Sequence, residues 1–71
     1  MITNQNKINF ILNIRQQSFV SFLDYINPNN KDLIKFVKEE YSNMSIEELN
    51  IEYAYYNEYI KQYKIIQFKF L

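Results

Sequence analysis

The sequence contains no cysteine, no histidine and no glycine, and its 71 residues include only one proline and one arginine. Without cysteine the chain has no disulfide and no thiolate metal site, and without histidine it has no imidazole ligand and no histidine base. A glycine-rich phosphate loop is excluded as well. The lack of cysteine fits a reducing compartment, and we therefore expect a cytoplasmic protein.

Positive and negative charges balance, with 8 basic and 8 acidic residues and a formal net charge of zero. This balance argues against a protein that its overall field holds on nucleic acid. No apolar run approaches the roughly 18 residues of a membrane span, and the polar residues 1–9 do not resemble a signal peptide. We therefore expect neither a membrane segment nor export.

The composition follows codon bias. Phe, Tyr, Met, Ile, Asn and Lys, which have A/T-rich codons, make up 43 of the 71 residues, whereas Gly, Ala, Arg and Pro together make up 3. This bias indicates an A/T-rich genome, such as that of a low-G+C bacterium, its phages or plasmids, or certain parasites. We therefore attach no functional meaning to the richness in asparagine.

Apolar spacing predicts a single domain with three helices, over about residues 4–26, 30–42 and 46–68. The first helix has a weak point at residues 15–18, where a kink or a split into two shorter helices is possible. Its apolar stripe recurs every three or four residues and comprises Ile8, Leu12, Arg15, Phe19, Phe22 and Ile26, widened by Ile11, Leu23 and Tyr25.

The other two helices have clearer starts. Residues 27–30 (Asn-Pro-Asn-Asn) break the chain, and Asn29 or Asn30 caps the second helix. Ser45 and Glu48 form a capping box for the third helix. The second helix is expected to bury Leu33, Val37, Tyr41 and Met44, helped by Ile34, and the third carries a heptad stripe of Ile46, Leu49, Tyr53, Tyr56, Ile60, Tyr63, Gln67 and Phe70.

These elements predict an all-α fold, a small antiparallel three-helix bundle. A chain of this size buries only about 60% of its extended surface, so it needs an efficient core, a second copy of itself or a partner. We therefore expect a homodimer through the C-terminal helix, with Tyr55, Tyr59, Ile66 or Phe70 contributing. The competing outcome is a monomer that reserves this surface for another protein.

Catalysis is not expected. Glu48 and Glu52 lie one helical turn apart, but they belong to the first turns of one helix, where the helix dipole favours acidic residues. An acid–base or metal site needs groups that converge from several elements. We predict no catalytic residue, no metal ligand and no cofactor.

Candidate binding residues are aromatic residues off the helical stripes, the single arginine and apolar residues of the C-terminal segment. Tyr55 and Tyr59 lie off the third stripe, and tyrosine is enriched at interfaces. Phe36 lies off the second stripe, and Arg15 takes an apolar position in the first, either as a side chain extended to solvent, paired with a glutamate across the bundle, or as an interface anchor. In the apolar C-terminal segment 65–71, Ile66 and Phe70 are candidates for the core, a second copy or a target.

The sequence thus favours a small non-enzymatic protein-binding module, an inhibitor or regulator that is encoded by a phage or mobile element and occludes a larger host protein. The first alternative is a nucleic-acid-binding transcriptional regulator, in which a dimer gathers Lys31, Lys35 and Lys38. Steep salt dependence of DNA binding would distinguish it. The second is a self-assembling structural subunit, recognisable by a mass far above that of a dimer.

Overall fold

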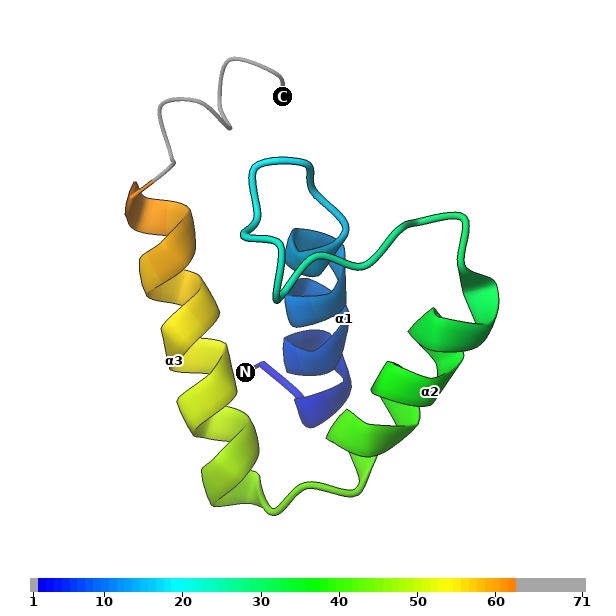
Figure 1. Cartoon of the computed structure of the whole chain (residues 1–71). Coiled ribbons are helices and arrows are strands. Elements are labelled where there is room, and N and C mark those ends of the chain that lie inside the picture. The colour runs from blue at the N-terminus through cyan, green and yellow to red at the C-terminus, as the bar shows by residue number, and fades with distance from the viewer. Residues whose placement is uncertain (1, 63–71) are drawn as a thin grey trace.

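The computed structural model describes residues 2–62 and places three helices there, α1 (Asn4–Arg15), α2 (Lys31–Ser42) and α3 (Ile46–Gln62). The central helix α1 packs against both α2 and α3 (Figure 1). α1 and α3 run in one direction and α2 returns in the other, so helices that follow one another in the chain are antiparallel (Figure 1). The predicted all-α three-helix bundle is confirmed.

The first helix is shorter than predicted, because α1 ends at Arg15 and not near residue 26. The sequence marked this point as weak, and the structure shows how the helix can stop there. All four of its last carbonyls, which a helix leaves without partners, accept hydrogen bonds from residues beyond the helix. The Leu12 carbonyl accepts from the Gln16 side chain at 3.0 Å, and the Asn13 carbonyl accepts from the Gln16 N–H at 3.3 Å. The Ile14 carbonyl accepts from the Gln17 N–H at 3.0 Å, and the Arg15 carbonyl accepts from the Ile26 N–H at 2.7 Å.

Residues 16–30 therefore form a connection that folds back over the end of α1 (Figure 1). Val20 and Ile26 enter the core from this connection, whereas Phe22 is 92% and Leu23 87% exposed. The prediction that Phe22 and Leu23 line the buried face of a helix is wrong, because that face does not exist beyond residue 15.

The starts of α2 and α3 are as predicted. The Asn30 side chain accepts from Leu33 N–H at 3.1 Å. Ser45 Oγ accepts from Glu48 N–H at 3.1 Å, and Glu48 Oε1 accepts from Ser45 N–H at 3.2 Å. The expected continuation of the third helix over 63–68 lies outside the described residues.

The core is centred on α1. Two positions expected in the apolar stripes, Leu33 and Ile46, are exposed, and each lies in the first turn of its helix. Leu49 and Tyr56 carry the buried face of α3, as expected. The buried residues are Ile8, Ile11, Leu12, Ile14, Val20, Ile26, Tyr41, Leu49 and Tyr56.

The capping box gives a first prediction. Ser45→Ala should lower the free energy of unfolding by about 1 kcal/mol, because the Glu48 N–H loses its acceptor at the start of α3. Urea unfolding followed by circular dichroism measures the change. Ser42→Ala is the matched control, since Ser42 Oγ only donates to the helical Lys38 carbonyl, and it should change stability by less than about 0.5 kcal/mol. Equal effects of the two changes would contradict the cap.

Candidate functional site

Arg15 lies at the C-terminal end of α1 and is directed into the molecule. Its Nε donates to the Asp24 carbonyl and its Nη1 to Tyr41 Oη, both at 2.8 Å. The guanidinium carbon also lies 5.9 Å from the centroid of the Tyr41 ring. Arg15 therefore forms hydrogen bonds within the chain. Its binding of a partner, another of the roles that the sequence left open, stays a prediction.

Tyr41 connects Arg15 to an acidic residue on another helix. Its hydroxyl accepts from Arg15 and donates to Glu52 Oε1 at 3.0 Å. Arg15 is thus linked to a glutamate, one of the roles left open for it, but indirectly, because the Tyr41 hydroxyl lies between the two charged groups. The chain Arg15–Tyr41–Glu52 joins the end of α1 to α2 and α3.

A second tyrosine fixes the connection between α1 and α2. Tyr56 Oη donates to Asp24 Oδ1 at 3.1 Å, and Ser21 Oγ donates to Asp24 Oδ2 at 3.0 Å. The Asp24 carboxylate therefore has a hydroxyl on each oxygen. Asp24 also gives its carbonyl to Arg15, so it is held from α1 and α3 together.

Burial raises the pKa values of the Tyr41 and Tyr56 hydroxyls above the usual value of 10.0, and nearby Arg15 opposes this only in part. A phenol whose folded pKa is raised contributes stability that is fully present below the unfolded pKa and is lost as pH rises through the folded pKa. We therefore expect the free energy of unfolding to be nearly constant between about pH 6 and 9, where histidine would titrate but is absent, and to fall above about pH 10.

Urea unfolding at several pH values measures this dependence. In Tyr56→Phe the fall above about pH 10 should be smaller, because one of the two buried phenols is gone. A stability that is unchanged or rises between about pH 10 and 12 would contradict the assignment.

Tyr59 holds the same connection at a different point. Its hydroxyl accepts from Ser21 N–H at 2.9 Å and donates to the Phe19 carbonyl at 3.1 Å. The rings of Phe19 and Tyr59 also lie close, with centroids 6.0 Å apart. Tyr55 and Tyr59 share one face of α3, as expected from their spacing, with ring centroids 6.3 Å apart. Tyr59 is nevertheless packed against the core, because it contacts Phe19 and Ser21 of the 16–30 connection.

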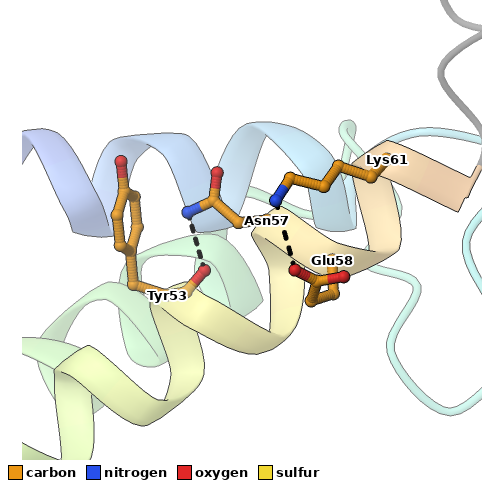
Figure 2. A network of polar contacts seen from close by, with 4 residues as sticks. All are labelled: Tyr53, Asn57, Glu58 and Lys61. Atoms are coloured by element: carbon orange, nitrogen blue, oxygen red, sulfur yellow. Dashed lines mark hydrogen bonds and ion pairs between the residues drawn. The ribbon is translucent and has the colours of Figure 1, made fainter.

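Tyr55 is 50% exposed, and its ring centroid lies 4.9 Å from that of Tyr56 and 6.3 Å from that of Tyr59. Beside it is a hollow of about 370 Å³ lined by Tyr55, Glu58, Tyr59 and Gln62. Figure 2 shows how the neighbouring side chains are held along α3: Asn57 donates to the Tyr53 carbonyl at 3.0 Å, and Lys61 pairs with Glu58 at 3.3 Å. Because Glu58 lines the hollow, one side of the hollow carries a charged side chain.

The other candidates do not join Tyr55 in one site. Phe36 is 57% exposed, as expected, but it belongs to α2, which packs on α1 separately from α3. Ile66 and Phe70 lie outside the described residues. A second hollow, of about 230 Å³, is lined by Arg15, Val37, Glu40, Tyr41, Met44 and Glu52.

The strongest surface feature is one that the sequence analysis missed, the pair Phe22–Leu23. These residues form the tip of a turn in which the Ser21 carbonyl accepts from Asp24 N–H at 3.0 Å and from Tyr25 N–H at 2.9 Å. The spacing of Ser21 and Asp24, three residues apart, is a pattern that closes turns and was available in the sequence. The helical spacing of the apolar residues concealed it.

The described part of the chain holds no group of three or more acidic residues placed to bind a metal ion. None of its helices combines the length and apolar character that crossing a membrane requires. Comparisons of the chain with protein families, with curated proteins and with solved structures found no match.

Proposed function

We propose that this chain is a small non-enzymatic protein-binding module that works by covering a surface of a larger protein. One observation supports the proposal most: within residues 2–62, nine large hydrophobic side chains are exposed, as many as the core buries. Contiguous exposed apolar side chains mark interaction sites, and within this set Phe22 and Leu23 are adjacent. The exposed residues are Ile2, Phe22, Leu23, Tyr25, Leu33, Phe36, Ile46, Ile51 and Tyr55.

Charge favours a protein partner over nucleic acid. Lys31, Lys35 and Lys38 are exposed on α2, but the same helix carries Asp32, Glu39 and Glu40, so its net charge is zero. Affinity for nucleic acid depends mainly on neutralising phosphates with a cationic surface. The acidic residues of the same helix reduce the positive potential that its lysines can offer to phosphates.

The finer form of the proposal is an inhibitor or regulator that is encoded by a phage or mobile element with an A/T-rich genome and acts in the cytoplasm of the host. Codon bias, small size and the lack of histidine and cysteine support it. The homodimer through α3 stays a prediction. Exposed Tyr55 is available for such a contact, whereas the Tyr59 hydroxyl is bonded within the chain.

An affinity pulldown of the full chain from its native host, followed by mass spectrometry, tests the proposal. We expect one host protein to be retained in near-equimolar amount, with binding that changes little with salt. Recovery of nucleic acid with steep salt dependence would contradict the proposal and favour the transcriptional regulator. A solution mass far above that of a dimer, with no host protein retained, would favour the structural subunit.

A further inference from the structure

We propose that residues 16–26 are a conformational switch. Held by α3, they form the observed connection, and released from α3 they wind onto α1 as one continuous helix over 4–26. Three features of the structure support this: the way α1 ends, the turns already formed in residues 16–26, and the bonds that keep those turns away from α1. A switch of this kind is a property of the chain alone, so it stands or falls separately from the proposed function.

The end of α1 lacks a local stop signal. Helices commonly end at a glycine or asparagine with positive φ, or shortly before a proline. Residues 16–26 contain no glycine, asparagine or proline. Gln16, which follows the last helical residue, has φ −92° and ψ 1°, and no residue in the described range 2–62 has a positive φ. The sequence beyond Arg15 therefore does not forbid further turns of helix.

The switch segment is already wound in part. The Val20 N–H donates to the Gln17 carbonyl at 3.1 Å, a bond that spans three residues as in a 3₁₀-helix. The Tyr25 N–H donates to the Ser21 carbonyl at 2.9 Å, a bond that spans four residues as in an α-helix. Two short turns with helix-like hydrogen bonds thus follow α1.

Two backbone groups show why the connection and a continuous helix compete. In a helix, the Arg15 carbonyl accepts from the N–H four residues later, and the Ser21 N–H donates to the carbonyl four residues earlier. In the structure, the Arg15 carbonyl accepts from the Ile26 N–H at 2.7 Å, and the Ser21 N–H donates to Tyr59 Oη at 2.9 Å. The two forms therefore use the same backbone groups with different partners.

Hydroxyl groups of α3 hold the connection in its observed form. Tyr59 Oη accepts from the Ser21 N–H and donates to the Phe19 carbonyl at 3.1 Å. Tyr56 Oη donates to Asp24 Oδ1, also at 3.1 Å. Loss of these bonds shifts the balance toward the helix, because helical hydrogen bonds are local and need no contact with α3.

Winding changes the apolar surface that the segment presents. In the connection, Phe22 and Leu23 are 92% and 87% exposed, whereas Ile26 is 1% exposed. In a helix over 4–26, Phe19, Phe22 and Ile26 join Arg15 on one stripe, because they follow it at spacings of four, three and four residues. Withdrawal of Ile26 from the core costs stability, so the connection is the more populated form of the unchanged chain.

The test removes the hydroxyls of α3 that hold the connection. Tyr56→Phe/Tyr59→Phe keeps both rings and deletes their bonds to residues 16–26. The matched control is Tyr53→Phe/Tyr55→Phe on the same helix, since no hydrogen bond within residues 2–62 joins these two hydroxyls to the connection. Each form of the full chain is examined by backbone NMR and by circular dichroism at 222 nm.

We expect Tyr56→Phe/Tyr59→Phe to show helical Cα chemical shifts and protected amides over residues 16–26, while the control matches the unchanged chain. The ellipticity at 222 nm should grow by up to about a quarter, because residues 16–26 join helices of 12, 12 and 17 residues.

The substitution Phe22→Pro separates the two forms. Phe22 follows Ser21 in a turn closed by the Asp24 N–H, a position that proline favours, and its own N–H donates no hydrogen bond within residues 2–62. Proline in the interior of a helix breaks the helix. We therefore expect Phe22→Pro alone to leave the melting temperature undiminished, and to abolish the gain of helix when it is added to Tyr56→Phe/Tyr59→Phe.

Other outcomes overturn the switch. Coil-like shifts with rapid exchange over residues 16–26 in Tyr56→Phe/Tyr59→Phe would show a released loop with no helical alternative. Shifts equal to those of the unchanged chain would show that the α3 hydroxyls do not hold the connection. A gain of helix that survives Phe22→Pro, or that the control shares, would place its cause elsewhere in the chain.

If Tyr56→Phe/Tyr59→Phe unfolds as a whole, chemical exchange saturation transfer on the unchanged chain decides the question. A minor state with helical Cα shifts over residues 16–26 that is lost in Phe22→Pro supports the switch. Absence of such a state contradicts it.

Discussion

Replacing Ile26 by alanine is expected to lower the free energy of unfolding by about 2–5 kcal/mol, the range for a large side chain truncated in a packed core. Ile26 is 1% exposed and reaches the core from the connection between α1 and α2. The same change loosens the chain segment whose N–H bonds the last carbonyl of α1. Urea unfolding followed by circular dichroism measures the loss.

Phe22→Ala is the matched control for Ile26→Ala, because the predicted helix 4–26 would bury both residues on one stripe. In the structure Phe22 is 92% exposed, so its truncation should change the free energy of unfolding by less than about 0.5 kcal/mol. Equal losses of several kcal/mol from both changes would mean that the helix continues through residue 26.

Tyr41→Phe is expected to lower the free energy of unfolding by about 2–3 kcal/mol. The change removes a hydroxyl that bonds two charged groups, Arg15 at 2.8 Å and Glu52 at 3.0 Å. Hydrogen bonds to charged groups contribute about 1.5–3 kcal/mol, and a half-buried charge that loses its partner adds a desolvation cost. Thermal and urea unfolding measure the difference.

Tyr55→Phe is the control for Tyr41→Phe, because Tyr55 is 50% exposed and the change should stay within about 0.5 kcal/mol. A double-mutant cycle of Arg15→Met with Tyr41→Phe should give a coupling energy above about 0.5 kcal/mol. Additive effects of the two changes, or a Tyr41→Phe variant as stable as the unchanged chain, would show that the network contributes no stability.

Helix starts were predictable because their causes are local. The capping box of Ser45 and Glu48 and the Asn30 cap are satisfied within four residues of chain, so three-residue spacing identifies them. The buried faces around Leu49 and Tyr56 also followed from periodicity, since those residues face α1 along a regular helix.

The connection 16–30 was not predictable in the same way, because its apolar residues keep helical spacing without forming a helix. Ile26 is buried both in the predicted helix 4–26 and in the structure. In the structure, however, it reaches the core because the 16–30 connection folds back and is held by α3. The bonds that fix this return join residues 32 to 40 positions apart, between Asp24 and Tyr56 and between Phe19 and Tyr59. Periodicity carries no information on such contacts.

The candidate binding residues predicted from the sequence differ from those that the structure exposes for the same reason. Tyr59 was expected at a partner surface, and for Arg15 that was one of three roles left open. Each bonds the 16–30 connection, which a continuous first helix does not contain. With the connection held by these contacts, Phe22 and Leu23 are the exposed apolar residues at its tip. Tyr55 and Phe36, which depend only on the regular helices α3 and α2, are exposed as the sequence indicated.

The central claim is that residues 16–30 are an ordered connection that presents Phe22 and Leu23 at a fixed tip. Amide hydrogen exchange measured residue by residue by NMR tests it most directly. We predict protection at the Ser21 and Ile26 amides, which donate to Tyr59 Oη and to the Arg15 carbonyl, and rapid exchange at Phe22 and Leu23, whose amides donate no hydrogen bond within residues 2–62. Continuous protection from residue 19 to 26 would indicate a helix, and rapid exchange throughout would indicate an unclamped loop; either result would contradict the account.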